Sequence, residues 1–166
     1  YKNRLGVLEL FAAFRATAPE ALKGAIKLLM VGKPATEAMT RLLKAEGLEG
    51  EVRFLHGVRN EVLQALYTGA AGFVFPSLYE GFGWPIAEAM ACGCPVITTG
   101  DAPMSEVGGA AAWYIPRRPN EGGKAIEGWA RTGAERLLQM VQLSAEDRAA
   151  LSTRCLEEAK RFAPGT

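Results

Sequence analysis

Cysteine and histidine are scarce in this sequence, which argues against two kinds of site. The chain has three cysteines and one histidine, and Cys92 and Cys94 are only two residues apart. An odd cysteine count does not suit a disulfide framework, so we expect a reducing, cytoplasmic compartment. A metal or redox pair at Cys92 and Cys94 would lack further cysteine or histidine ligands nearby in the sequence. We therefore expect small buried residues at these positions and no metal.

Long apolar runs and an excess of one charge are also absent. No run reaches about 18 apolar residues, so we expect no membrane-spanning helix, and residues 1–4 do not resemble a signal peptide. Lysine and arginine number 19 against 18 for aspartate and glutamate, a net charge of +1. This balance argues against nucleic-acid binding and requires any anion site to be local. Because the chain lacks an initiator methionine, we expect a piece cut from a longer protein.

Short apolar runs alternate with helical patterns along the chain. The runs that predict buried strands are residues 26–31, 52–55, 72–75, 95–99 and 111–115. Helical spacing separates them, and residues 123–162 are mostly helical with a break near Ser144. Alternation of this kind predicts an α/β fold, a Rossmann-like doubly wound parallel sheet flanked by helices. The length of 166 residues favours one domain over 1–166, with 123–166 as its terminal helices.

The ends of the predicted strands carry the most informative residues. In doubly wound sheets, ligands bind outside the carboxyl ends of the strands. Those ends hold Lys33 after Gly32, His56 with Gly57, and the segment 77–83. Lys33 is equally suited to binding phosphates or to facing solvent, and His56 is equally suited to a ligand or a structural role. Farther along, Arg117–Arg118 is interpreted as a solvated pair rather than a binding patch.

The segment 77–88 predicts an anion site at a helix start. Gly81 and Gly83 flank Phe82, which leaves the backbone free to turn and to approach a ligand closely. Pro85 stands where the first helical residue is expected, so the amides around Gly83 point outward without partners. Free amides and the positive end of the helix dipole bind anions without lysine or arginine. A phosphate or diphosphate suits this site.

Two carboxylates bracket the same segment. Glu80 precedes the glycines, and Glu88 follows one turn inside the helix. Carboxylates accept paired hydrogen bonds, which the neighbouring hydroxyls of a ribose or a hexose supply. The residues therefore suggest a diphosphate with a sugar at each end. The alternative is that both acids are solvated charges favoured by the helix dipole.

Residues 80–97 carry a family resemblance. This stretch resembles the Glu-x7-Glu segment of retaining glycosyltransferases of family 4, within glycosyl transferases group 1. The chain is similar to the C-terminal, nucleotide-sugar-binding domain of a two-domain GT-B enzyme, over about residues 1–116. The segments that also match, in the family's order, are Tyr1–Asn3, Met30–Gly32, Phe54–Val58 and Ser105–Gly109.

The resemblance implies a role for each matching residue of the Glu-x7-Glu segment. Glu80 would contact hydroxyls of the donor sugar. The amides of Gly81, Phe82 and Gly83 would approach the sugar and the diphosphate. Glu88 would hold the nucleotide ribose.

Outside that segment, the resemblance implies that Lys2 neutralises the diphosphate as the glycosidic bond breaks. The turn at His56 and Gly57 would lie near the base. It implies a nucleotide-sugar donor as substrate, with no metal and no cofactor.

The chain departs from the family's pattern in three ways. The family's diphosphate arginine would precede Tyr1, on a first strand that this chain does not contain. Trp84 stands where a smaller aliphatic residue is usual. The N-terminal acceptor domain, a partner within the same protein, is absent, so we expect little transfer by the fragment alone. Peripheral attachment of the whole enzyme to the inner face of a membrane stays open.

The expected function is transfer of a hexose from a nucleotide diphosphate sugar to an acceptor hydroxyl, with retention. One alternative is a non-catalytic nucleotide or sugar-phosphate binding module of the same fold. Another is a GT-B-like phosphorylase or nucleotide-sugar epimerase. A phosphorylase would need a lysine that bears pyridoxal, and no motif for one is visible.

Overall fold

Strands and helices alternate along the chain, as the sequence predicts. The computed structural model describes residues 1–165. In chain order the elements are α1 (Arg4–Thr17), β1 (Leu28–Val31), α2 (Glu37–Ala45), β2 (Val52–Leu55), α3 (Asn60–Gly69), β3 (Phe73–Phe75), α4 (Trp84–Ala91), β4 (Val96–Thr99), α5 (Met104–Gly108), β5 (Trp113–Ile115), α6 (Gly123–Val141), α7 (Ala145–Ala159) and the 3-10 turn η1 (Lys160–Phe162). The α/β class is confirmed.

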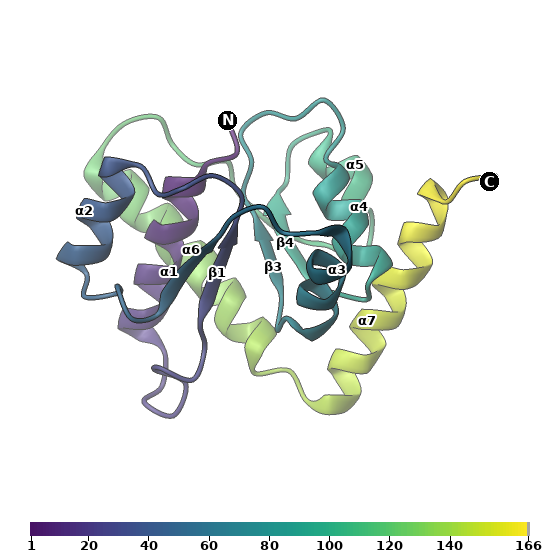
Figure 1. Cartoon of the computed structure of the whole chain (residues 1–166), viewed down its shortest axis with the longest axis horizontal. Coiled ribbons are helices and arrows are strands. Elements are labelled where there is room, and N and C mark those ends of the chain that lie inside the picture. Colours follow the sequence, from purple (N-terminus) through teal and green to yellow (C-terminus); the bar gives the residue numbers. More distant parts are fainter. Residues whose placement is uncertain (166) are drawn as a thin grey trace.

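All strand pairs are parallel, but they form two hydrogen-bonded sheets rather than the single sheet expected. One sheet pairs β1 with β2, and the other has the order β3–β4–β5. β1 and β3 lie side by side between helices on both sides (Figure 1). They share no ladder within residues 1–165. β1 and β3 therefore each keep one edge without a ladder partner in the described chain.

The core forms where apolar helix faces pack over the strands. All four residues of β4 are buried, as expected for a strand covered on both faces. The long helix α6 packs against α1, whose Leu8, Leu10 and Phe14 are almost completely buried. α7 packs against α4 on the other side of the strands, so it reaches the helix that carries Glu88 (Figure 1).

Helix ends differ from the sequence prediction in small ways. Ser144 caps α7 as expected, accepting a hydrogen bond from the Asp147 amide at 3.0 Å. Asn60 is the first residue of α3 rather than its cap. α4 begins at Trp84, which puts Pro85 in the second helical position, where a missing amide proton is still tolerated. Helix α5 was not predicted, because five residues are too few to show a helical period.

No helix within the described residues has the combination of length and apolar character that a membrane crossing requires.

Two glycines of α6 give a matched test of the α1–α6 packing. A Cβ at Gly133 would overlap the buried Leu10 side chain, whereas a Cβ at Gly128 would meet nothing within 4 Å. We expect Gly133→Ala to lower the free energy of unfolding by about 1–3 kcal/mol through overpacking. Gly128→Ala should raise it by about 0.5–1 kcal/mol, because alanine is the better helix former. Chemical unfolding of both variants measures the difference, and equal effects would contradict this account of the interface.

Candidate functional site

The predicted site residues gather at the carboxyl ends of the strands. Lys33 follows β1, His56 and Gly57 follow β2, and the loop 77–83 connects β3 to α4. Since all strands are parallel, these segments lie at one edge of the molecule.

The first residues of the chain join the two sheets at this edge. The Tyr1 carbonyl accepts a hydrogen bond from the Leu78 amide at 2.8 Å, and the Asn3 side-chain amide donates to the Pro76 carbonyl at 3.0 Å. The Arg4 guanidinium donates in the other direction, to the carbonyls of residues 33 and 34 after β1. Lys2 is therefore placed between the ends of β1 and β3, and its side chain is exposed.

Ser77 connects Glu80 to the start of the chain. Its hydroxyl oxygen is buried and lies 2.9 Å from a Glu80 carboxylate oxygen, 3.0 Å from the Tyr79 carbonyl and 3.2 Å from the Tyr1 carbonyl. Its one proton serves one of these acceptors at a time. Sequence reasoning gave no role to Ser77, although a serine at the end of an apolar strand, three residues before Glu80, was a usable signal. Lys2 and Glu80 are thus brought to one place through a buried hydroxyl.

The glycine loop has the open geometry that the sequence predicts. Gly83 precedes α4 with φ +99°, a left-handed conformation that glycine adopts readily. A Cβ there would approach Ile86 Cδ1 at 3.4 Å, whereas a Cβ at the exposed Gly81 would meet nothing within 4 Å. No side chain caps α4, Pro85 has no amide proton, and the Ile86 amide donates to the Gly83 carbonyl at 2.9 Å. Within the first turn this leaves the Trp84 amide for solvent or a ligand. The loop can therefore present backbone amides to an anion.

Glu88 points toward a different part of the surface from Glu80. It is exposed on α4 and lines a hollow of about 340 Å³ between α3 and α4, together with Asn60, Gln64 and Tyr67. Burial raises the pKa of Tyr67, and the charge of Glu88 adds to the effect. Within residues 1–165 neither Glu80 nor Glu88 forms an ion pair. Both carboxylates are therefore available to hydroxyl donors.

His56, Gly57 and Lys33 form a second group, at the end of the β1–β2 sheet. His56 Nδ1 lies 2.7 Å from the Gly32 carbonyl, and since a carbonyl only accepts, Nδ1 carries the proton. Gly57 has φ +59° with open space around it, and the Lys33 side chain is exposed. Among the described residues no hydrogen bond or ion pair links this group to the loop 80–83.

The arginine pair after β5 is not the solvated pair that the sequence suggested. Arg118 makes two hydrogen bonds to the Glu9 carboxylate, at 2.6 and 2.7 Å, and these raise its pKa. The Arg117 guanidinium lies 4.5 Å from the centre of the Tyr79 ring and 3.7 Å from a carboxylate oxygen of Asp101. Arg117 is thus a cation at the strand-end edge, beside the residue that precedes Glu80. The local sequence carried no signal for this long-range contact.

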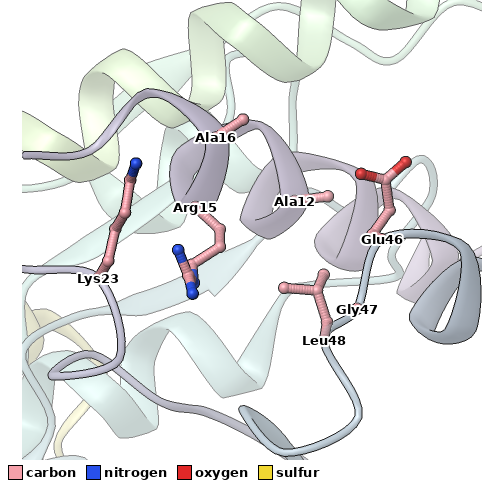
Figure 2. A pocket seen from close by; sticks show the side chains of 7 residues that line it. All are labelled: Ala12, Arg15, Ala16, Lys23, Glu46, Gly47 and Leu48. Atoms are coloured by element: carbon pink, nitrogen blue, oxygen red, sulfur yellow. The ribbon is translucent and has the colours of Figure 1, made fainter. Parts of the chain in front are cut away.

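A second hollow lies at the opposite edge. Figure 2 shows the side chains of Arg15 and Lys23 at a pocket of about 260 Å³, near the turn at Gly47. These segments precede β1 and β2, so the pocket lies at the amino ends of the strands. Arg15 is paired there with Glu51 at 2.8 Å. It forms no part of the candidate site.

The described residues contain no group of three histidine, cysteine, aspartate or glutamate side chains placed to hold a metal ion. Cys92, Cys94 and Cys155 are free thiols. Burial raises the pKa of Cys94 to about 12 and that of Cys155 to about 11, so both stay protonated at neutral pH.

Solved structures share this fold. The Anabaena protein HepE, in complex with UDP and glucose, superposes with a TM-score of 0.75 over 97% of this chain and 41% of its own, at 18% identity. That identity supports the fold alone.

Curated relatives match the chain in sequence. The O-antigen chain mannosyltransferase B of Escherichia coli is 44% identical over 75 residues, 45% of this chain and 20% of its own. The MMP alpha-(1->4)-mannosyltransferase of Mycolicibacterium hassiacum is 38% identical over 85 residues, 51% of this chain and 21% of its own. The chain therefore spans about a fifth of the length of these relatives. A profile of the family described as "Glycosyl transferases group 1" matches residues 1–127, more than half of the chain, and the chain belongs to that family.

Proposed function

We propose that the chain is the donor-binding domain of a retaining glycosyltransferase of family 4. The whole protein would transfer a hexose from a nucleotide diphosphate sugar to an acceptor hydroxyl. The observation that carries the proposal is the junction at the strand ends, where hydrogen bonds from Ser77 and Leu78 to Tyr1 place Lys2 beside the segment that carries Glu80. A cation, a carboxylate and the backbone amides of the glycine loop before α4 together match the parts of a sugar diphosphate.

Each part of the donor has a partner of suitable chemistry. The diphosphate lies against the amides of Gly81, Phe82 and Gly83 with Lys2 nearby, and the sugar hydroxyls donate to Glu80. The ribose hydroxyls donate to Glu88, which faces the hollow beside α3. The base lies toward His56 and Gly57, and the exposed Lys33, which follows β1, is a further cation for the phosphates.

The reaction needs charge stabilisation more than a nucleophile. The bond between the sugar C1 and the diphosphate oxygen breaks, and the leaving diphosphate takes both bonding electrons. Lys2 and the amides at the start of α4 offset the growing negative charge. A leaving phosphate oxygen takes the proton from the acceptor hydroxyl, which forms its bond to C1 on the same face. The anomeric configuration is retained without an enzyme carboxylate attacking the sugar.

The same proposal covers the longer protein. The chain is the C-terminal domain of a two-domain enzyme, and the N-terminal domain binds the acceptor. A strand that precedes Tyr1 would run between β1 and β3, because Tyr1 lies between the ends of both strands and each has a free edge. It would unite the two sheets in the order β2–β1–new strand–β3–β4–β5. We place the enzyme in the cytoplasm, with peripheral attachment of the whole enzyme to the inner face of a membrane as the alternative.

Substitution of the two carboxylates separates their roles. In the longer protein, isothermal titration with UDP, GDP and ADP identifies the base, and titration with the corresponding sugars follows. Glu88→Gln should weaken binding of the nucleoside diphosphate by about 10–100-fold, because charged hydrogen bonds to the ribose are lost. Glu80→Gln should spare the nucleoside diphosphate and weaken only the nucleotide sugar.

Glu61→Gln is the matched control, since Glu61 is exposed on α3 but does not line the hollow. Unchanged nucleotide binding by Glu88→Gln would refute the ribose assignment. A parent protein that binds the donor but neither transfers nor hydrolyses it would favour the non-catalytic alternative.

Gly81→Ala tests whether the ligand approaches the loop backbone closely. The added methyl group meets no protein atom within 4 Å, so the melting temperature should stay unchanged. Donor affinity should fall by about tenfold, as the methyl group occupies the space of the ligand. Gly69→Ala on α3, which also meets nothing, is the control. Unaltered donor affinity in Gly81→Ala, measured by calorimetry, would count against the proposed pose.

A further inference from the structure

The side chain at the centre of the glycine loop is held from outside the loop. The Phe82 ring lies between two other rings: that of Trp84, with centroids 4.5 Å apart, and that of Phe162, with centroids 5.3 Å apart. The contact with Phe162 is edge to face, at an interplanar angle of 86°. Such pairs stabilise beyond the area that they bury. Phe162 belongs to the turn η1, eighty residues farther along the chain.

The turn that carries Phe162 is itself anchored. Arg161 donates from Nη2 to the Glu106 carbonyl of α5 at 3.0 Å, and it pairs with Glu158 of α7. Its guanidinium lies 5.1 Å from the centre of the Phe162 ring. A Cβ at Gly109 would overlap Glu158, so α7 approaches the end of α5 closely. The turn therefore has a fixed position relative to α5 as well as to α4.

The loop has few internal contacts that could replace this one. Gly81 has no side chain and stands in open space. Gly83 is the N-cap residue of α4 in the left-handed conformation, and its contact with the helix is a backbone one, from the Ile86 amide to the Gly83 carbonyl at 2.9 Å. Glu80 is held at one end by Ser77. At the other end the side-chain contacts are those that the Phe82 ring makes with Trp84 and Phe162, and Trp84 is 58% exposed. The ring of Phe162, supplied by the turn η1, is half-buried and is thus the less exposed of the two rings that contact Phe82.

We propose that Phe162 is a positioning residue for the donor loop. It acts through Phe82 to hold the amides of Gly81, Phe82 and Gly83 where they face the diphosphate and the sugar. This inference rests on the proposed function, and it adds a segment that neither the glycine motif nor the family match includes, since the matched residues end at 127. Phe162 needs no contact with the donor.

The test is donor binding by Phe162→Ala in the longer protein. Calorimetry compares a nucleotide sugar, chosen from UDP-glucose, UDP-GlcNAc and GDP-mannose by the parent's binding, with the matching nucleoside monophosphate. We expect affinity for the nucleotide sugar to fall by about tenfold, since an edge-to-face contact is lost. Affinity for the monophosphate should be little changed, because Glu88 is on α4 and away from the loop. Phe162→Tyr, which keeps the ring, should restore the parent's affinity for the sugar.

Leu156→Ala is the matched control, on helix α7, which immediately precedes the turn η1. Leu156 lies near Gly93 at the far end of α4, where a Gly93 Cβ would come within 3.7 Å of it. Hydrogen exchange without ligand gives an independent reading. The peptide 79–86 should exchange faster in Phe162→Ala than in the parent protein. In Leu156→Ala it should exchange at the same rate as in the parent.

The outcomes separate the two proposals. The positioning role would be overturned if Phe162→Ala lost equal affinity for the nucleotide sugar and the monophosphate. It would also be overturned if Phe162→Ala and Leu156→Ala had the same affinities and exchange rates. Either result would leave the proposed donor binding intact. A parent protein that binds none of the three sugars would overturn the proposed function itself, and the inference with it.

Discussion

The candidate site depends on a small polar junction between residues far apart in the sequence. The Ser77 hydroxyl and the Leu78 amide both lie within hydrogen-bond distance of the Tyr1 carbonyl, and the same hydroxyl reaches Glu80. Ser77 is completely buried, so a missing partner would leave a buried polar group unsatisfied. Because of that penalty, Lys2 and Glu80 stay at the same edge of the molecule although they are 78 positions apart in the sequence.

This junction also explains how the proposed anion site can contain two acidic residues. The chain is almost neutral overall, so attraction for a diphosphate has to come from local groups. Glu80 is restrained by Ser77, and Glu88 faces the hollow beside α3. Within the described residues no carboxylate caps α4, and Lys2 and Arg117 add positive charge at the same edge. Glu80 and Glu88 are left to hydroxyl donors, which carboxylates accept well.

Local patterns in the sequence predicted what local physics determines. The apolar runs located five strands, and the glycines around Phe82 predicted the turn before α4. Long-range contacts left no such trace. The stacking of Arg117 on Tyr79 and the contact between Phe82 and Phe162 both join residues from separate elements. The break between β1 and β3 was missed for the same reason, since each strand has the same kind of apolar sequence run whether or not a neighbour pairs with it.

In a loop rich in glycine, close access of a ligand to the backbone and a fixed backbone conformation are opposing requirements. Gly81 and Gly83 let a ligand approach the backbone, and for that reason they contribute no side chain that could fix the loop. Order then has to come from neighbouring elements, here from Ser77 on one side and the ring of Phe162 on the other. The residues that match the family end at 127, but this second support comes from the turn after α7. The rigidity of a shared motif can therefore be specified by a segment outside it, and two chains with the same glycine loop can hold it to different degrees.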